Sequence, residues 1–299
     1  MRSIVALNTE NQCDLSVIIV NYNTAELLAI CLRSIEADAP RKTEIVVVDN
    51  ASRDNSVKLV RKDFPKVYLI ANKNNVGFAK ANNQAVKVTT GRYLYFLNPD
   101  TELKPGALQA MRNFMDSHPD IGLAGTRIVN PDGSPQPSVE THYPGERSAK
   151  NDLIDLKGEI AWVLGASMIM RRNLFNELRG FDEAFFLYGE EQDLCLRVRK
   201  AGFPIGYIPD AVVVHWGGQS ETGVPSVQVW NKKLDAEFVF YHKHYSNKAI
   251  KRIRLKNIIQ ALWRILTIRI TIGLLSNKER SRQKLEKYQL VFKRFRKSV

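Results

Sequence analysis

Apolar runs alternate with amphipathic stretches along the first part of the chain. Each apolar run stops at polar residues, as buried parallel strands do. The predicted strands are 15–23, 44–52, 67–72 and 92–100. The stretches between and after them carry apolar residues at helical spacing, and Thr24 is a candidate N-cap for the first of them. The predicted helices are 24–37, 54–62, 77–89 and 105–117. This alternation predicts an α/β fold in which helices flank a mainly parallel sheet.

The second part of the chain is predicted to add a long loop, a helix and one more strand. Residues 130–158 are rich in Pro, Gly, Ser and charge, and we expect a long loop there, of the kind that often carries function. After an apolar run at 162–172, residues 179–203 lead from a loop into an amphipathic helix with an acidic first turn. A last strand is predicted over 205–214, and it ends at His215.

Polar side chains stand at the carboxyl ends of three predicted strands. They are Asn21 to Asn23, Asp49 with Asn50, and Asn98 with Asp100. Because Asn and Asp also favour turns, a single polar end would be weak evidence of a site. Ligands of parallel α/β sheets bind beyond the carboxyl ends of the strands, so three polar ends together favour a binding site at that edge.

Asp100 is the first candidate for chemistry. A carboxylate on a loop at a strand end suits a hard divalent cation that also holds phosphate groups. The alternative is an ordinary turn residue ahead of Thr101, and Asp100 alone does not decide between the two.

An acidic cluster of Glu190, Glu191 and Asp193 begins the amphipathic helix. Its ordinary explanation is negative charge at a helix N-terminus, where it complements the helix dipole. Three aromatic residues and a glycine come just before the cluster. Apolar surroundings raise the pKa of a carboxylate toward the range of a general base, and we therefore favour a catalytic base in this cluster.

His215 is followed by Trp216, two glycines, Gln219 and Ser220. Glycines let a backbone approach a phosphate closely, and Gln and Ser side chains donate hydrogen bonds. An isolated histidine is usually structural. Beside this loop, and in a chain with a candidate metal carboxylate, His215 is a better candidate ligand.

No glycine-rich phosphate fingerprint follows the first predicted strand. The chain continues as NYNTAELL, without the G-x-G-x-x-G of dinucleotide-binding enzymes or the P-loop of NTPases. This counts against a dinucleotide-dependent dehydrogenase and against a P-loop NTPase.

These residues together resemble the family 2 glycosyltransferases, which have the GT-A fold, and among them the bacterial rhamnosyltransferase-like members. The resemblance covers about residues 14–222. It rests on eight segments in the same order: SVIIVNYN, VVVDNAS, NVGFAKANN, YFLNPDT, NPDGSPQPS, VLGASMIMRR, GFDEAFFLYGEEQDLCLRVRKAG and VVHWGGQS. It implies a GT-A-type mixed, mainly parallel sheet flanked by helices, with a C-terminal helical extension.

The resemblance also implies where the donor binds. The ends of the first two strands would hold the nucleotide base and ribose, and the segment that begins with Gly77 would lie near the base and the donor. The residues implied in donor and nucleotide binding are Val20, Asn21, Tyr22, Asp49, Gly77, Phe78, Asn82, Asn98 and Asp100.

Metal binding and catalysis are implied by two further matches. The D-x-D metal motif of the family stands here as Asn98-Pro99-Asp100, so Asp100 would be the main metal carboxylate, joined by His215. The catalytic base of the family is the second acid of a Glu-Asp pair, which corresponds to Glu191. The acceptor or the diphosphate would lie near Gly165, Ala166, Glu190, Asp193, Trp216, Gln219 and Ser220.

The implied enzyme is an inverting, metal-dependent glycosyltransferase. Mg²⁺ or Mn²⁺ on Asp100 and His215 would neutralise the diphosphate leaving group, and Glu191 would take the proton of an acceptor hydroxyl that attacks from the opposite face. The favoured donor is dTDP-rhamnose, and the favoured acceptor is a glycan or a lipid-linked molecule in cell-surface polysaccharide synthesis. Alternatives are a UDP-galactofuranose or UDP-glucose transferase, a non-catalytic nucleotide-sugar-binding membrane scaffold, and a nucleotidyltransferase.

The positive charge of the chain is concentrated toward its C-terminal end. Residues 230–299 hold 19 Lys and Arg against 4 Asp and Glu, a net charge of +15, whereas residues 1–229 have a net charge of −2. Two parts with different partners are implied. We expect a tail over 1–14, a catalytic domain over 15–225 and a basic helical extension over 226–299.

The extension contains an apolar helical stretch from Leu255 to Leu275. Its polar stripe is Lys256, Gln260, Arg264, Thr267 and Thr271, and Arg269 does not fit the pattern. Because an arginine costs about 2.5–3.5 kcal/mol at a bilayer centre, we expect a helix that lies on an anionic membrane surface, supported by the polybasic segment after it. The alternatives are an ordinary helical subdomain and an interface between copies of the chain. Nucleic-acid binding is not expected, because no nucleic-acid motif accompanies the charge.

The N-terminus and the cysteines bear on location. The first residues lack the apolar run of a signal peptide. Cys13, Cys31 and Cys195 are odd in number and lack metal-ligand spacing, which favours free thiols in a reducing compartment. We therefore expect a cytoplasmic protein that associates peripherally with the inner face of the cell membrane.

Overall fold

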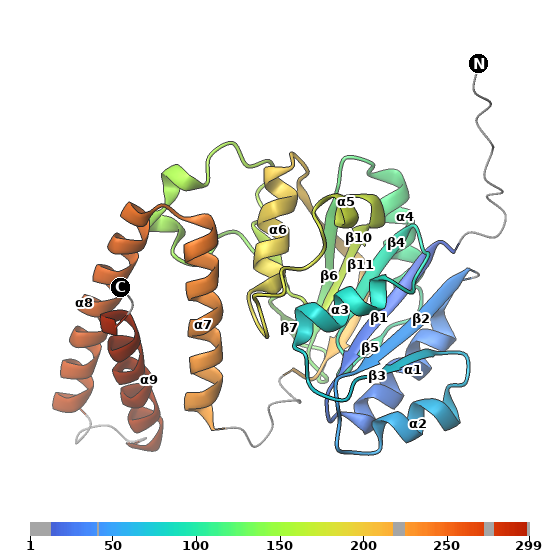
Figure 1. Ribbon diagram of the computed structural model, residues 1–299, viewed down its shortest axis with the longest axis horizontal. Helices are drawn as coiled ribbons and strands as arrows, with labels where there is room; N and C mark the ends of the chain where they lie inside the picture. Colours follow the sequence, from blue (N-terminus) through green and yellow to red (C-terminus); the bar gives the residue numbers. More distant parts are fainter. Residues whose placement is uncertain (1–12, 41, 218–224, 272–277, 298–299) are drawn as a thin grey trace. The chain divides into compact units, whose positions relative to one another are not determined.

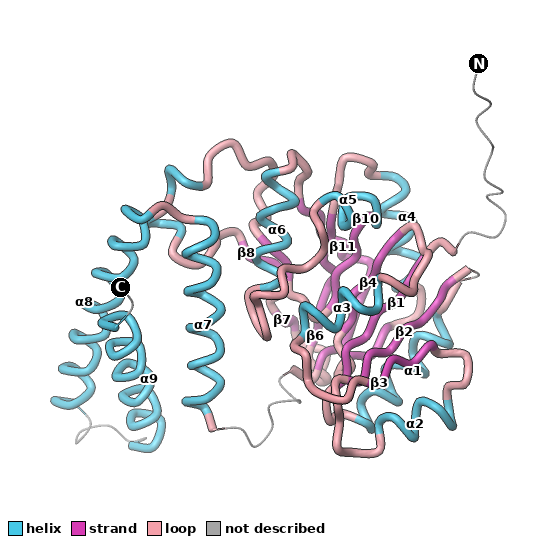
Figure 2. The backbone as a smooth tube through the Cα atoms, viewed as in Figure 1, coloured by secondary structure: helices cyan, strands magenta, loops and turns pink. Residues whose placement is uncertain are grey.

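The computed structural model describes residues 13–40, 42–217, 225–271 and 278–297, and the chain divides into two compact units (Figures 1 and 2). We call the first the sheet unit; it consists of residues 1–142, 156–186 and 190–220. We call the second the helical unit; it consists of residues 143–155, 187–189 and 221–299.

The sheet unit is built on one large sheet. Over the described residues this sheet has nine strands in the order β3-β2-β1-β4-β10-β6-β11-β5, with β7 paired to β6. Its strands are β1 (Leu15–Asn21), β2 (Thr43–Asp49), β3 (Tyr68–Ala71), β4 (Tyr93–Leu97), β5 (Thr101–Leu103), β6 (Leu123–Val129), β7 (Pro135–Gln136), β10 (Ser167–Arg171) and β11 (Ile205–His215). A separate pair joins β8 (Val139–Glu140) to β9 (Trp162–Val163).

Most neighbours in the large sheet are parallel. β1 pairs in parallel with β2 and β4, β2 with β3, and β6 with β11. β10 runs antiparallel between β4 and β6, and β5 runs antiparallel to β11. The predicted mixed, mainly parallel sheet is therefore confirmed.

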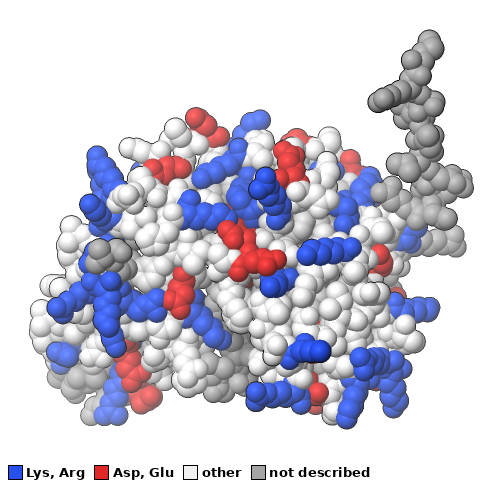
Figure 3. Space-filling view, viewed as in Figure 1, with Lys and Arg blue, Asp and Glu red and all other residues white. Residues whose placement is uncertain are grey.

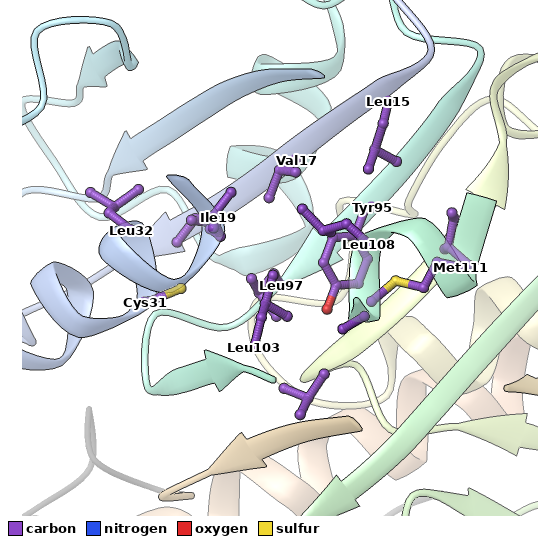
Figure 4. Close-up of a cluster of buried hydrophobic side chains, with 14 of the residues drawn as sticks. Leu15, Val17, Ile19, Cys31, Leu32, Tyr95, Leu97, Leu103, Leu108 and Met111 are labelled. Carbon is purple, nitrogen blue, oxygen red and sulfur yellow. The ribbon is translucent and has the colours of Figure 1, made fainter. Parts of the chain in front are cut away.

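Helices cover both faces of the sheet (Figure 1). One face packs against α1 (Ala25–Asp38), α2 (Ser56–Asp63) and α4 (Ala107–Ser117). The other face packs against α3 (Phe78–Val86), α5 (Arg172–Glu177) and α6 (Glu190–Lys200). Successive strand residues point to opposite faces, so Val17 and Ile19 enter the first core and Ile18 enters the second. Figure 4 shows part of the first core, where side chains of β1 and β4 meet those of α1 and α4.

The N-terminus of α1 differs from the prediction in its capping. The helix begins after Thr24, but the Thr24 hydroxyl donates to Asn21 Oδ1 (2.7 Å) and makes no cap. Asp54 Oδ2 instead accepts from the backbone N–H of Ala25 (2.9 Å). Thr24 therefore occupies the predicted N-cap position, but a carboxylate from the loop before α2, and not its own hydroxyl, satisfies a free N–H of the helix.

The segment over 130–158 is less irregular than predicted. It contains β7, β8 and two short 3₁₀ turns, Glu146–Ser148 and Lys150–Asp152. Strand β6, which lies ahead of it, was not among the predicted strands. β6 is held by pairing with β10 and β11, which are distant in sequence, and β7 is held by pairing with β6 across a turn. The local pattern of apolar residues does not indicate such pairing.

The helical unit contains α7 (Ser226–His244), α8 (Asn247–Thr271) and α9 (Lys278–Lys297), in agreement with the expected helical extension. The Arg254 guanidinium of α8 donates to the backbone carbonyls of Phe295 (2.8 Å) and Arg296 (2.9 Å) at the end of α9. Tyr245, after α7, donates its hydroxyl to the Pro144 carbonyl (2.7 Å) and so ties the 143–155 segment to these helices. None of the described helices is long and apolar enough to cross a membrane.

Candidate active site

Parallel pairing brings three polar strand ends to one edge of the sheet. In the register of the sheet, Asn21 lies opposite Asp49, and Ile19 lies opposite Leu97, the residue before Asn98. The carboxyl ends of β1, β2 and β4 therefore meet at the same edge, as predicted. This is the edge at which ligands of open α/β sheets bind.

The ends of β1 and β2 form a closed hydrogen-bond network. Asn21 Nδ2 donates to Asp49 Oδ2 (2.9 Å) and to Ser52 Oγ (3.1 Å), and Asp49 Oδ1 accepts from the backbone N–H of Ser52 (2.9 Å). Asn21, Asp49 and Val20 are buried, and Tyr22 is half-buried. Both carboxylate oxygens of Asp49 thus have partners within the protein, and the network fixes the edge on which these residues lie.

The next polar residue, Asn50, organises the loop before α3. Its side chain accepts from the Val76 N–H (3.0 Å) and donates to the Gly77 carbonyl (3.2 Å). Gly77 has a φ of +87°, and a Cβ there would come within 2.8 Å of the Phe186 carbonyl oxygen, so only glycine fits. The Phe78 N–H donates to that same oxygen (2.7 Å).

Because of this contact, the glycine segment lies against the chain just ahead of the acidic cluster. Asn82, by contrast, is buried and donates to the Phe78 carbonyl one turn earlier in α3 (3.0 Å). Its side chain therefore holds the start of the helix.

Asp100 and His215 lie beside each other, as their candidate roles require. Asp100 Oδ1 is 3.5 Å from His215 Nε2, and both side chains are buried. The pairing of β5 with β11 sets Thr101 opposite His215, and the Trp216 N–H donates to the Asp100 carbonyl (3.0 Å). Two residues distant in sequence are thus fixed side by side by backbone pairing.

Gln136 is a residue of this site that the sequence reasoning missed. Its Oε1 lies 3.0 Å from His215 Nδ1. Nδ1–H can donate to this oxygen, and Nε2 is the ring nitrogen that faces Asp100. Within the described part of the chain, His215 Nε2 is buried and has no hydrogen-bond partner.

The sequence contained a signal for Gln136, but nothing in it assigned this residue a role. It lies in NPDGSPQPS, one of the segments that carry the family resemblance, yet no residue of that segment was assigned a role. Its position follows from the pairing of β7 with β6, in which Gln136 lies opposite Ile128.

The acidic cluster occupies the first turn of α6 and is buried. Glu190 and Glu191 are 5% and 8% exposed. A Cβ placed on Gly165 would lie 3.5 Å from Glu191 Cβ, and the next residue, Ala166, accepts through its carbonyl from the Asn98 N–H (2.9 Å). The Gly165–Ala166 turn therefore lies between the first turn of α6 and the loop that carries Asp100.

Glu190 and Asp193 have different surroundings. Burial, and next the Glu191 carboxylate, raise the pKa of Glu190 well above its ordinary value, and Glu190 Oε2 has no hydrogen-bond partner among the described residues. Asp193 is fully buried and forms an ion pair with Arg197 one turn later (2.7 Å), and Arg197 also donates to the Leu178 carbonyl (2.8 Å). This ion pair gives Asp193 a structural role in fixing α6.

The described residues contain no group of three or more His, Cys, Asp or Glu side chains arranged to hold a metal ion. Asp100 and His215 are a pair and not part of such a group. The predicted residues Gln219 and Ser220 lie outside the described residues.

Comparison with known protein families shows which family the chain belongs to. The model of the family described as Glycosyl transferase family 2 matches residues 16–179, more than half of the chain. The chain belongs to glycosyl transferase family 2. It is a glycosyltransferase, and the predicted membership of this family is confirmed.

Two relatives of this glycosyltransferase are named for the sugar that they transfer. The N-acetylglucosaminyl-diphospho-decaprenol L-rhamnosyltransferase of Mycobacterium tuberculosis is 26% identical over 236 residues, which cover 67% of this chain and 75% of that protein. The poly(ribitol-phosphate) beta-glucosyltransferase of Bacillus spizizenii is 29% identical over 274 residues, which cover 81% of this chain and 42% of that protein.

A solved structure supports the fold. The mannosyltransferase of Pyrobaculum calidifontis in complex with GDP-Man and Mn²⁺ matches with a TM-score of 0.61 at 18% identity. The match covers 94% of this chain and 85% of that one. At this identity the likeness shows the fold alone, and the glycosyltransferase described here has the GT-A fold.

The buried Glu190 predicts a pH dependence of stability. Its pKa is raised in the folded chain, so folding takes up a proton between the ordinary value, about 4.3, and the raised one. The free energy of unfolding therefore falls as the pH rises through this window, by at most about 1.4 kcal/mol per pH unit for one proton. We expect Glu190→Gln to be more stable than the wild type at about pH 7.5 and equal to it below about pH 4.

Urea unfolding at several pH values measures this difference. Glu177→Gln is the control, because Glu177 is exposed at the end of α5 and the change removes the same charge in contact with water. A difference between Glu190→Gln and the wild type that is the same at every pH would contradict the prediction.

Proposed function

We propose that this glycosyltransferase moves a sugar, with inversion, from a nucleotide-diphosphate donor to a hydroxyl of a glycan or lipid-linked acceptor in cell-surface polysaccharide synthesis. L-rhamnose from dTDP-rhamnose is the favoured donor sugar, in keeping with the name of the mycobacterial relative. The observation that carries the proposal is the arrangement around the Gly165–Ala166 turn. Through this turn a buried carboxylate, Glu191, lies near the loop that carries Asp100 beside His215.

A divalent cation, Mg²⁺ or Mn²⁺, fits the residues of this site. His215 Nε2 is buried, faces Asp100 Oδ1 and has no hydrogen-bond partner among the described residues, which is an arrangement that a shared cation would satisfy. Carboxylate oxygen and imidazole nitrogen are both ligands of Mn²⁺, and the diphosphate would complete the coordination that two protein groups leave open. When bound, the ion would supply neutralisation of the charge that develops on the leaving diphosphate.

Glu191 is the proposed general base. It is buried, and it lies beside the Gly165–Ala166 turn that leads to the loop of Asp100, so a hydroxyl held against it could pass its proton to the carboxylate. Glu190 beside it binds its proton more tightly than an ordinary glutamate, so the pair avoids two adjacent negative charges. A hydroxyl that loses its proton to Glu191 attacks the anomeric carbon from the side opposite the diphosphate, and this attack inverts the configuration.

The remaining assignments follow the strand ends. The nucleotide base and ribose are proposed to bind beside the edge made by Val20, Asn21, Tyr22 and Asp49, which the hydrogen bonds of Asn21 and Asp49 keep rigid. Gly77, Phe78 and Asn82 are proposed to adjoin the donor, and Asn98 to lie beside it. The acceptor or diphosphate region is proposed at Gly165, Ala166, Glu190 and Trp216. Asp193 is left out of it because the carboxylate pairs with Arg197.

The chain is also proposed to work at a membrane surface. A catalytic domain over 15–225 would be followed by the basic extension over 226–299, whose charge would hold the enzyme to the inner face of the cell membrane. A lipid-linked acceptor would explain such a location.

A donor screen tests the proposed reaction. We expect calorimetry in the presence of Mn²⁺ to give tighter binding of dTDP-rhamnose than of UDP-galactofuranose or UDP-glucose, and turnover to release a nucleoside diphosphate. Tighter binding and turnover of UDP-glucose would favour the alternative donor, in keeping with the Bacillus relative. Release of pyrophosphate would identify a nucleotidyltransferase, and donor binding without turnover on glycan or lipid-linked acceptors would favour a non-catalytic scaffold.

Glu191→Gln tests the base. We expect the rate of transfer to fall by about 10²–10⁴-fold, because the amide cannot accept the proton, while the donor Kd changes little. Transfer is measured by product release and donor binding by calorimetry, with Glu177→Gln as the matched surface control. If Glu191→Gln keeps near wild-type transfer and Glu190→Gln abolishes it, the base is Glu190 and the assignment is wrong.

Gln136→Leu tests the orientation of His215. We expect the affinity for Mn²⁺, measured by electron paramagnetic resonance with nucleoside diphosphate present, to fall by about 10-fold or more, as is usual when a partner of a metal ligand is lost. Asp100→Asn should weaken it further, and Gln109→Leu on the surface of α4 is the matched control. Unchanged Mn²⁺ affinity in both Gln136→Leu and Asp100→Asn would exclude a cation at this pair.

A further inference from the structure

Helix α8 carries an apolar stripe that the helical unit leaves uncovered. Six large apolar side chains on it are between 49% and 69% exposed. They are Leu255, Ile259, Leu262, Trp263, Leu266 and Ile270, and we call them the α8 stripe. At about 100° per residue they fall within one sector about 100° wide, so they form a continuous band along the helix.

The opposite face of α8 holds the helix within its unit. Ala249, Ile253 and Ala261 are buried there, and the Arg254 guanidinium is bound to the end of α9. The α8 stripe is therefore not needed to keep the helix folded. Its side chains contribute a band of exposed apolar surface of the kind that marks a binding face.

The charge of α8 indicates what covers this band. All residues of the helix are described, and they include seven Lys and Arg and no Asp or Glu. On the helical wheel Lys251 and Arg269 flank one margin of the stripe and Lys256 flanks the other. Arg269, which did not fit the polar stripe expected from the sequence, thus belongs to the margin of the apolar one.

The neighbouring helix adds charge of the same sign. Helix α9 contains nine Lys and Arg and two Glu. Figure 3 shows Lys and Arg side chains gathered over the part of the molecule that α8 and α9 form.

We infer that α8 lies in the plane of an anionic phospholipid surface, with the α8 stripe inserted and the flanking Lys and Arg bound to lipid phosphates. An apolar band with basic margins and a tryptophan near its middle is the pattern of helices that lie in a membrane interface. A second copy of this chain fits the α8 stripe less well, because two copies of α8, which contains no acidic residue, would repel each other face to face. A nucleic acid would use the basic margins but leave the apolar band exposed.

This inference deepens the proposed function, because it names the partner that would bring the enzyme to a lipid-linked acceptor. The binding itself needs neither donor nor acceptor. A test on vesicles therefore fails or succeeds independently of the proposed reaction.

Flotation of the full chain with vesicles tests the inference. We expect the wild type to float with vesicles that contain phosphatidylglycerol, to bind vesicles of phosphatidylcholine alone much more weakly, and to be released by high salt. The double variant Leu262→Glu with Leu266→Glu places two carboxylates in the stripe, and we expect it to lose affinity by about tenfold or more. The matched control is Gln260→Glu with Thr271→Glu, which adds the same charge at exposed positions outside the stripe and should bind within about threefold of the wild type.

Circular dichroism and donor binding by calorimetry show whether the variants remain folded, which we expect because all four positions are exposed. The tryptophan emission of the wild type should shift to the blue on vesicles, and Trp263→Phe should lose most of that shift. Wild type that does not float with anionic vesicles, or a stripe variant that floats as well as the control, would overturn the inference. A wild-type dimer that the stripe variant converts to a monomer, without vesicle binding by either, would also overturn it and assign the stripe to a second copy.

Discussion

The antiparallel pairing of β5 with β11 places Thr101 opposite His215, and with it sets the Asp100 carboxylate beside the histidine ring. The rest of the site is arranged around this pair. β7 pairs with β6, and its residue Gln136 contacts His215. The turn before β10 contacts the loop of Asp100, because the Asn98 N–H donates to the Ala166 carbonyl. Because backbone hydrogen bonds hold these segments, the candidate site residues lie on well-fixed elements.

Buried polar groups divide into two kinds at this edge of the sheet. Asn21, Asp49 and Asn50 have protein partners for their side chains, and they stabilise the loops that join strands to helices. Glu190 and His215 each keep one buried atom without a partner in the described part of the chain. A buried polar atom without a partner lowers the free energy of unfolding by about 1–3 kcal/mol. Proteins keep such atoms mainly at sites where a ligand or a proton satisfies them during function.

The helical unit also keeps groups that its own packing leaves unsatisfied, here apolar side chains on the surface of α8. Its helices bury one face of α8 and leave the other apolar and exposed, although exposure of six large apolar side chains disfavours solution in water. The basic residues on both margins give that face a chemical preference for an anionic interface. Under the proposals above, sugar transfer and attachment to a surface would be served by different compact units of one chain.

The sequence by itself determined the elements that repeat locally. Strands β1, β2 and β4 are apolar runs that stop at polar residues, and α1 carries apolar residues at a spacing of about 3.6, so each of these elements can be read from its own residues. Ordered motifs identified the family, and they pointed to Asp100, Glu191 and His215. Pairing and packing between distant segments decided the rest. Gln136 became a partner of His215 only through the register of β7, and the Asp54 carboxylate, not the Thr24 hydroxyl, accepts from the first N–H of α1. Likewise, only the packing of α8 on one face determined which of its many apolar residues stay exposed, because a periodic pattern specifies that a face exists but not what covers it.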